Sequence, residues 1–255
     1  TKRNIDVRKS TKVRIMNKVV FIGDIHGHDT WKRIVADEHN ADHFVFVGDY
    51  FDAFVITPAV QIHNFKEIIE FKEANPDRVT LLMGNHDYHY TSYCTGRYGG
   101  YSIWHAAEIG ELLKANAHNL LVAWQHENVL ATHAGVSKTW YDEHATKLGN
   151  MFEIADTLNL LWSERPDYFN HSGRNSFGNS PYDGPFWIRP EALKLDLVDP
   201  DIIQIVGHTQ RERISSFSNG KRIAGSDNVF VIDTLPREYL VLEDDEFTVA
   251  NVYSK

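Results

Sequence analysis

An apolar run at residues 79–83, followed at once by Gly-Asn-His-Asp at residues 84–87, most constrains what this chain can fold into. A short continuous apolar run is typical of a strand buried on both faces, as in a parallel sheet. Polar side chains at the C-terminal end of such a strand indicate a ligand-binding role, because open α/β sheets bind their ligands there. Asn85 and His86 are therefore candidate functional residues.

Two upstream segments repeat this pattern. One apolar run ends in Gly-Asp-Ile-His-Gly, which contains Asp24 and His26, and another ends in Gly-Asp-Tyr-Phe-Asp, which contains Asp49 and Asp52. Three predicted strands thus deliver carboxylates, imidazoles and an amide to one edge of a sheet.

The segments between these runs predict helices. We expect strands at residues 19–22, 44–47 and 79–83, separated by helices at residues 29–37 and 58–74. The longer helix begins with a Thr-Pro pair, in which threonine is a good N-cap and proline suits the first helical position. Alternating strands and helices predict an α/β fold whose parallel sheet has right-handed crossovers.

The second half of the chain continues with less regular spacing. We expect a Tyr- and Gly-rich loop at residues 88–101 and helices at 103–114, 137–147 and 152–161. We also expect a hairpin of residues 120–124 with 129–132 and a strand at 202–206. The remainder predicts short antiparallel strands with turns at 219–220 and 243–245. Two of these strands end in His133 and His208. Five strand ends therefore carry candidate functional side chains.

The length of 255 residues suits one large domain with a substantial core. Basic residues recur at residues 1–17 with little apolar periodicity, so we expect a basic lead-in there and a single domain at residues 18–255. Residues 163–190 are rich in Gly, Pro, Asn and Ser, which predicts an irregular, lid-like insertion.

Charge and cysteine content restrict the partners and the location. A formal net charge of −9 argues against nucleic acid as a partner, because electrostatically driven binders are usually basic. The single cysteine, Cys94, excludes an internal disulfide and a cysteine-based zinc site, so a reducing, cytoplasmic location is the default expectation. No export signal and no apolar run of membrane-span length are evident, so we expect no membrane partner.

The combination of side chains at the strand ends predicts a metal centre. Carboxylate, imidazole and amide ligands without thiolate suit Mn, Fe, Zn or Co better than a soft metal. These candidate ligands are too many for one catalytic ion that keeps a position open for water. They fit two ions about 3.5–4 Å apart that share a bridging carboxylate.

At this point the motifs resemble those of a known family. The ordered motifs at residues 23–27, 48–52, 84–87, 133–135 and 207–209 are similar to those of the calcineurin-like metallophosphoesterases. Gly-Asp-Tyr-Phe-Asp, together with Leu-Leu-Trp-Ser at residues 160–163, resembles the phosphoprotein phosphatase branch, which acts on phosphoserine and phosphothreonine. Asp-Gly-Pro-Phe-Trp-Ile-Arg at residues 183–189 is similar to bacterial-type members. The resemblance implies a four-layer sandwich of two mixed sheets flanked by helices, with a two-metal site at the strand C-terminal ends.

The resemblance also implies a role for each ligand candidate. Asp24 and His26 would hold the first ion, and Asp49 would bridge both ions. The second ion would be held by Asn85, His133 and His208. We expect divalent or trivalent transition-metal ions, with Mn as the first candidate and Fe, Zn or Co as alternatives.

The same resemblance implies a catalytic pair. A metal-bridging hydroxide would be the nucleophile, and His86 would protonate the leaving group. Asp52 would contact the other nitrogen of His86, because an imidazolium beside a dicationic centre would lose its proton unless a carboxylate restored its pKa.

One departure from the branch concerns the phosphate-binding arginine. The resembling phosphatases continue the second motif with Arg-Gly, whereas this chain has Ala53 and Phe54. Arg189 is the first candidate to replace that guanidinium. Arg97 and Arg174 are weaker candidates.

The resemblance predicts a phosphorylated partner and leaves its class open. The first expectation is a phosphomonoesterase of the serine/threonine protein phosphatase type, acting on a phosphoprotein or a small phosphoester. The alternatives are a nucleotide pyrophosphohydrolase similar to the diadenosine tetraphosphatases, for which the tyrosine-rich loop could stack a base, or a nucleic-acid end phosphatase. A non-catalytic scaffold would be expected to have lost metal ligands, and here all six candidates are present.

Overall fold

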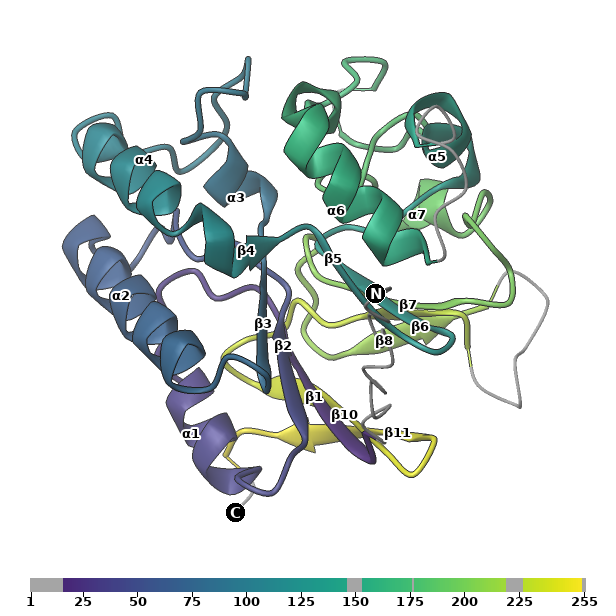
Figure 1. The fold of residues 1–255 in the computed structure, drawn as a ribbon, viewed down its shortest axis with the longest axis horizontal. Coiled ribbons are helices and arrows are strands. Elements are labelled where there is room, and N and C mark those ends of the chain that lie inside the picture. Colours follow the sequence, from purple (N-terminus) through teal and green to yellow (C-terminus); the bar gives the residue numbers. More distant parts are fainter. Residues whose placement is uncertain (1–15, 146–152, 176, 219–226, 254–255) are drawn as a thin grey trace, which may run out of the picture.

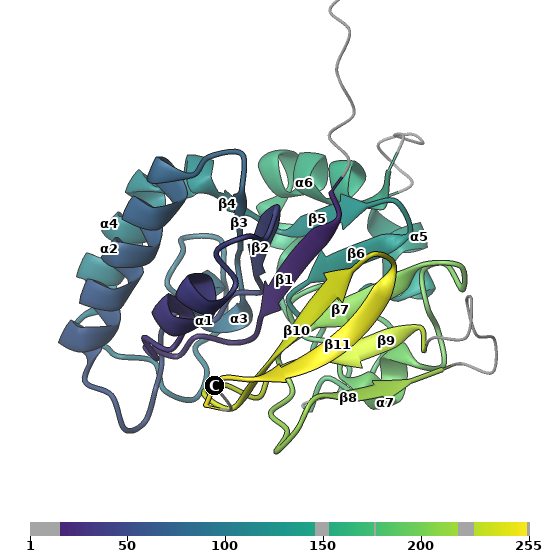
Figure 2. The same cartoon turned by 90° about the horizontal axis from the view of Figure 1, so that it is seen from below.

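Two β-sheets pack face to face, and helices cover the outer face of each (Figures 1 and 2). The computed structural model describes residues 16–145, 153–175, 177–218 and 227–253. The six-stranded sheet has the order β11-β10-β1-β2-β3-β4, and the five-stranded sheet has the order β5-β6-β7-β9-β8. The predicted four-layer α/β sandwich with two mixed sheets is confirmed.

The first sheet contains the strands that the apolar runs predicted. Its strands are β1 (Lys18–Ile22), β2 (His43–Phe46), β3 (Val79–Leu82), β4 (Leu120–Leu121), β10 (Glu238–Glu243) and β11 (Glu246–Asn251). Strands β1 to β4 run parallel, and β10 pairs antiparallel with β1. The expected turn at residues 243–245 joins β10 to β11.

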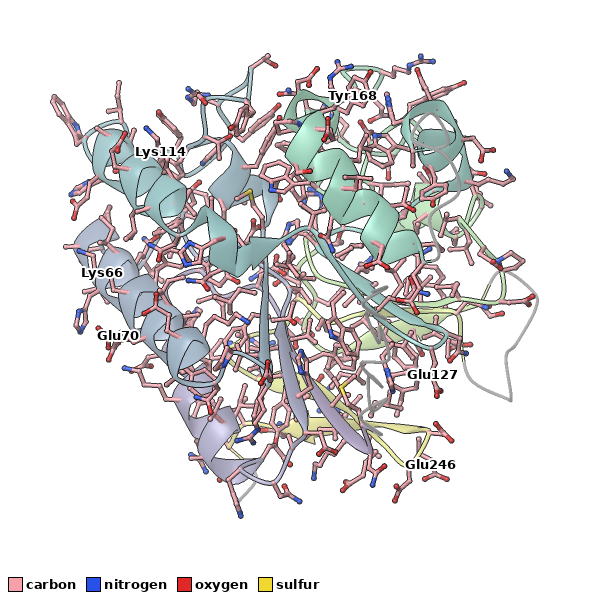
Figure 3. All side chains as sticks on the ribbon, viewed as in Figure 1. Lys66, Glu70, Lys114, Glu127, Tyr168 and Glu246 are labelled. Carbon is pink, nitrogen blue, oxygen red and sulfur yellow. The ribbon has the colours of Figure 1, made fainter. Side chains whose placement is uncertain are left out.

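Three helices cover the outer face of this sheet. They are α1 (Trp31–Asp37), α2 (Pro58–Ala74) and α4 (Ala106–Ala115), and they lie on the left in Figures 1 and 2. Helix α2 has the predicted bounds. Its apolar side packs into the core, whereas Lys66, Glu70 and Lys114 of α2 and α4 point away from the sheets (Figure 3).

The second sheet contains the other strand ends of interest. Its strands are β5 (Ala123–His126), β6 (Val129–Thr132), β7 (Ile203–Val206), β8 (Ser215–Phe217) and β9 (Val229–Val231). Its outer face is covered by α5 (Lys138–His144), α6 (Ile154–Glu164) and α7 (Pro190–Leu193), with the 3₁₀ helix η3 (Pro166–Phe169) after α6. The expected late antiparallel strands are present, since β8 pairs antiparallel with β9 and β10 with β11, and β9 additionally runs parallel to β7.

The expected hairpin of residues 120–124 with 129–132 is also wrong in part. Residues Leu120 and Leu121 pair with β3 in the first sheet, and only the next strand, β5, pairs with β6. The side chain of Asn159 on α6 accepts hydrogen bonds from the Val122 and Ala123 amides where the chain passes between the sheets. A distant side chain thus satisfies the backbone at the break.

Alternate residues of β1 pack into two different hydrophobic layers, one on each face of the sheet. Val19 and Phe21 pack between the sheets, whereas Val20 and Ile22 pack against the helices. Because both faces are covered, the strand is apolar at every position, which is why its sequence is a continuous run. The C-terminal ends of β1, β2 and β3 are thereby fixed side by side.

Several expectations concern segments only partly described. The basic lead-in at residues 1–15, residues 146–147 and 152 of two predicted helices, and the turn at 219–220 lie outside the described residues. The irregular segment 163–190 contributes Phe169, Phe186 and Ile188 to the buried core. In the part of the chain that is described, no helix combines the length and apolar character needed to cross a bilayer.

Candidate active site

The structure brings all six predicted ligand residues together between the ends of the two sheets. Nε2 of His133 lies 3.4 Å from Oδ2 of Asp49, and Nε2 of His26 lies 3.8 Å from the same oxygen. Oδ1 of Asn85 lies 2.8 Å from both Nε2 of His133 and Nδ1 of His208. Ligand atoms of Asp24, Asp49 and His133 lie within 4.8 Å of one another.

The backbone at these strand ends has unusual conformations. His26, Asp49, Asp52 and His208 all adopt left-handed φ angles, between 41° and 70°. Non-glycine residues rarely do so, and such strain is characteristic of functional sites. A Cβ atom added to Gly207 would lie 1.9 Å from Oδ1 of Asp24. Glycine is therefore required beside the carboxylate.

The three imidazoles are oriented as metal ligands usually are. His26 and His133 donate from Nδ1 to the carbonyls of Phe51 and Val47, and His208 donates from Nε2 to the Trp187 carbonyl. Such bonds to carbonyl groups fix the tautomer and direct the other nitrogen at the metal. Each remaining nitrogen faces the candidate centre.

One contact in particular fits a bound cation. Burial and the neighbouring His133 hold the pKa of His208 well below its usual value, so the ring is neutral and its Nδ1 carries a lone pair. That lone pair faces the carbonyl oxygen of Asn85 at 2.8 Å. Two acceptors at this distance repel each other, and a cation between them would bind both.

Buried carboxyl groups crowd around the same centre, and their mutual proximity opposes ionisation in the absence of a cation. Burial and the neighbouring Asp233 raise the pKa of Asp24 well above its usual value, and burial together with Asp49 raises the pKa of Asp233 to about 7. Burial acts in the same direction on Asp49, but His133 and His86 hold its pKa well below the usual value. Divalent cations among these groups would compensate their charge. The residues therefore fit a metal centre that Asp24, His26, Asp49, Asn85, His133 and His208 could hold.

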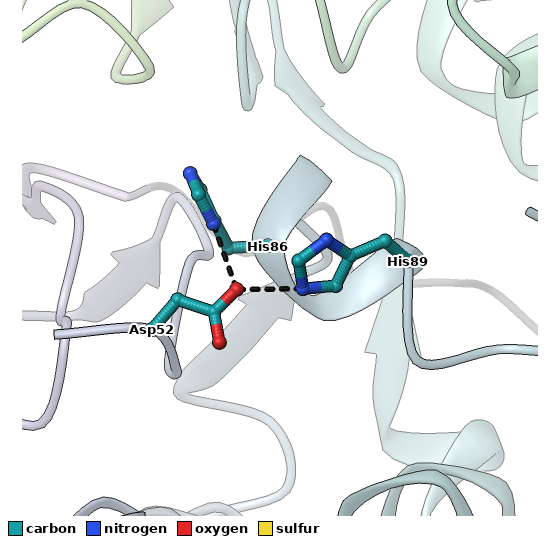
Figure 4. A group of neighbouring side chains, drawn as sticks. All are labelled: Asp52, His86 and His89. Atoms are coloured by element: carbon teal, nitrogen blue, oxygen red, sulfur yellow. Dashed lines mark hydrogen bonds and ion pairs between the residues drawn. The ribbon is translucent and has the colours of Figure 1, made fainter. Parts of the chain in front are cut away.

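A second cluster adjoins this centre (Figure 4). Oδ2 of Asp52 lies 2.9 Å from Nδ1 of His86 and 2.6 Å from Nε2 of His89, and Oδ1 accepts a hydrogen bond of 2.5 Å from the Tyr90 hydroxyl. Although burial lowers the pKa of His86, the nearby Asp49 and Asp52 raise it to about 9. The pair predicted from the sequence is thus present, and the imidazole is held in its protonated form.

His89 and Asp233 were not predicted as site residues, and Tyr90 was expected only as part of the tyrosine-rich loop. A short helix, α3 (Asn85–Tyr88), begins inside the third motif, where only a loop was expected after residue 87. Helical spacing places residues three apart on one side, so His89 follows His86 toward Asp52. Asp233 follows the apolar strand β9, and the pattern of the other strand ends could have identified it.

Asp87 fixes the loops instead of facing the centre. Its carboxylate accepts hydrogen bonds of 2.8 Å from the amides of Gly84, Asp49 and Tyr50. It thereby joins the ends of β2 and β3, as expected of a loop-fixing residue.

Arg189 lines a pocket of about 580 Å³ together with Asn85, His86 and His208. Its Nε donates to the Phe177 carbonyl at 2.9 Å, and its Nη1 donates to Thr209 Oγ1 at 3.2 Å. Within the described residues no hydrogen bond engages Nη2, which leaves this group for a ligand. Phe54, which replaces part of the Arg-Gly pair, also lines the pocket.

Comparisons with known proteins show the family of the chain and proteins of similar fold. A family model described as calcineurin-like phosphoesterase matches residues 17–212. A solved cold-active protein tyrosine phosphatase shares 19% identity at a TM-score of 0.64, covering 93% of this chain and 77% of that one. The chain is also similar to a protein serine/threonine phosphatase from Saccharomyces cerevisiae, with 14% identity and a TM-score of 0.53, covering 92% of this chain and 79% of that one. It is similar as well to a metallophosphoesterase from Sphaerobacter thermophilus, with 13% identity and a TM-score of 0.51, covering 92% of this chain and 88% of that one. At these identities the likeness to the solved structures concerns the fold.

Proposed function

Because the chain belongs to the calcineurin-like phosphoesterase family and is a phosphoester hydrolase, we propose that it is a bacterial-type member that hydrolyses phosphomonoesters of the serine/threonine phosphoprotein type. The observation that carries this proposal is the convergence of six ligand side chains beside the Asp52–His86 pair. Hydrolysis needs both groups of residues, because a metal centre would activate water and the Asp52–His86 pair would protonate the leaving oxygen.

We assign the ligands as two sets joined by Asp49. Asp24 and His26 would hold the first ion, Asn85, His133 and His208 would hold the second, and Asp49 would be a ligand of both. Mn is the first candidate for both positions, because oxygen and nitrogen donors without thiolate suit it. Two bound ions would activate a water molecule and neutralise phosphoryl charge.

His86 acts as the general acid in this proposal. Its Nδ1 contacts Asp52, so the other ring nitrogen carries the proton that the leaving oxygen receives. Asp52 stabilises the protonated ring. The neighbouring Tyr90 and His89 hold the carboxylate in place.

Arg189 binds the substrate phosphate in the place of the arginine missing at Ala53. Arg189 lines the same pocket as Asn85 and His86, and no hydrogen bond from the described residues engages its Nη2. Two further guanidinium nitrogens are anchored to protein oxygens, which holds the planar group in one orientation. A fixed guanidinium suits recognition of a phosphate.

The charge of the pocket favours a substrate with one phosphate. Among the described residues that line it, Arg189 is the one arginine or lysine. A dinucleoside polyphosphate has several charged phosphates, and further fixed cations would be expected beside it. The solved relatives include a tyrosine phosphatase and a serine/threonine phosphatase, so the shared fold accommodates different phosphorylated residues.

A substrate panel tests this proposal. The Mn-loaded protein should hydrolyse p-nitrophenyl phosphate and a phosphoserine peptide, and it should release phosphate more slowly from diadenosine tetraphosphate and from a 3′-phosphorylated oligonucleotide. A strong preference for the dinucleotide would instead support a nucleotide pyrophosphohydrolase, and a preference for the oligonucleotide would support an end phosphatase.

A further inference from the structure

A second pocket adjoins the candidate metal centre and shares no lining residue with the pocket that contains Arg189. Its volume is about 440 Å³. We call it the flanking pocket, and its lining includes His28, Gln210, Arg211, Glu212, Thr234 and Arg237. The proposed phosphoryl chemistry uses none of these side chains.

Segments that deliver ligand candidates to the centre continue into the flanking pocket. Gln210 comes two residues after His208, and His28 comes two residues after His26. Two residues of chain span at most about 7 Å, so the flanking pocket begins close to the centre. A substrate whose phosphate lies at the centre could therefore place a second group in this pocket.

The flanking pocket is basic, although the chain carries a formal net charge of −9. Its lining contains two arginines, Arg211 and Arg237, and one carboxylate, that of Glu212. The Arg211 amide donates to the Asp233 carbonyl at 2.9 Å, which fixes the backbone beside the centre. Among the described residues, no hydrogen bond or ion pair engages the Arg211 guanidinium. Nη1 of Arg237 donates to the Glu212 carbonyl at 3.3 Å, so both arginines belong to one local structure.

Arg211 lies near enough to Arg189 for the two charges to interact. Burial lowers the pKa of Arg189, the nearby Asp233 opposes this shift, and the positive charge of Arg211 lowers the pKa further. Two cationic groups in separate pockets thus lie on the two sides of the segment that carries His208.

We propose that the flanking pocket binds the carboxylate of an acidic residue close to the phosphorylated residue of a substrate peptide, so that the enzyme prefers acidic phosphopeptides. The inference rests on the proposed function. Arginine and carboxylate groups form charge-assisted hydrogen bonds. Residues two or three positions from a phosphoserine lie at most about 7–11 Å from it along an extended peptide, which matches the short path between the centre and this pocket. Because Glu212 also lines the pocket, a singly charged carboxylate meets less repulsion there than a doubly charged phosphate.

Two phosphoserine peptides test the inference on the Mn-loaded protein. One carries glutamate at the second and third positions on both sides of the phosphoserine, and the other carries glutamine there. At low ionic strength the acidic peptide should have a kcat/KM about tenfold higher, through a lower KM. About 0.5 M salt should reduce this preference, because exposed charges are screened. In the double variant Arg211→Gln/Arg237→Gln the kcat/KM values of the two peptides should become nearly equal.

A matched double variant controls for the change in net charge. Arg33→Gln/Arg165→Gln removes two exposed arginines outside the lining of both pockets and should retain the preference. Equal kcat/KM values in the parent protein, or a preference that persists in Arg211→Gln/Arg237→Gln, would overturn the inference alone. Loss of the preference in the control variant would also overturn it, because the effect would then arise from the overall charge. Hydrolysis of neither peptide would overturn both the proposed function and the inference.

Discussion

Nε2 of His89 lies 2.6 Å from Oδ2 of Asp52, and both side chains are buried. The Tyr98 amide donates to Nδ1 of His89, so Nδ1 is an acceptor and the ring proton is carried by Nε2, the nitrogen that lies beside the carboxylate. Asp52 therefore contacts a second imidazole, in addition to that of the proposed general acid His86. Through His89, Tyr98, which lines the pocket with Arg189, is connected to the Asp52–His86 pair.

Replacement of His89 should impair catalysis through Asp52. We expect His89→Leu to lower kcat about 10- to 100-fold with little change in KM, as is common when a residue that orients an active-site group is lost. His89→Gln retains a donor and should recover most of the rate, which a purely structural role would not predict. His118→Leu, at an exposed position, is the matched control. Equal losses in His89→Leu and His89→Gln would contradict the positioning role.

Replacement of Asp52 should affect poor leaving groups most. In Asp52→Asn the amide cannot stabilise a protonated His86, so an ester that needs proton donation should slow about 100-fold. p-Nitrophenyl phosphate, whose leaving group needs little protonation, should slow much less. Steady-state rates on both esters give the comparison. The same loss on both would argue against His86 as the acid.

Replacement of Arg189 should weaken phosphate binding. Loss of a charge-assisted hydrogen bond in Arg189→Gln should reduce kcat/KM about 10- to 100-fold and raise the inhibition constant of inorganic phosphate. Arg174, whose guanidinium lies over the Tyr182 ring outside the pocket lining, provides the control variant Arg174→Ala. If Arg174→Ala weakened phosphate inhibition and Arg189→Gln did not, the assignment of the clamp would be wrong.

Metal removal should make stability depend on pH. Burial raises the pKa values of Asp233 to about 7 and Asp87 to about 8, so each carboxyl in the metal-free protein must ionise in a buried place as pH rises. An acid whose folded pKa is raised contributes stability at low pH that is lost as pH rises through the folded pKa. Tm of the chelator-treated protein should therefore fall between about pH 5 and pH 8. Saturating Mn should flatten the curve, and Asp233→Asn should reduce its slope. A Tm that rises over this range without metal would contradict the charge cluster.

Much of the site could be predicted from the sequence because the ligands follow buried strands. Apolar runs such as residues 79–83 marked the strands of the parallel core, and the polar residues after them, Asn85 and His133 among them, converge because parallel strands end at one edge. The Pro58–Ala74 helix was predicted to the residue because proline and the Asn-Pro pair mark its ends.

The remainder depended on contacts between distant segments. The break between β4 and β5 is stabilised by Asn159, which is 37 residues from Val122, and local periodicity cannot reveal it. The helical turn Asn85–Tyr88, which carries His89 to Asp52, was not predicted. Arg189 could be proposed from its motif, but its anchoring on Phe177 and Thr209 could only be seen in the folded chain.

The bridging role of Asp49 is the central claim, since this carboxylate lies between the two proposed ligand sets. The most direct measurement is the metal content and p-nitrophenyl phosphate turnover of Mn-reconstituted parent and Asp49→Asn proteins, with the exposed-site variant Asp201→Asn as control. The parent and the control should bind two ions per chain, and Asp49→Asn should lose at least one ion and about 100-fold or more in kcat. Two ions and an unchanged rate in Asp49→Asn would contradict the account.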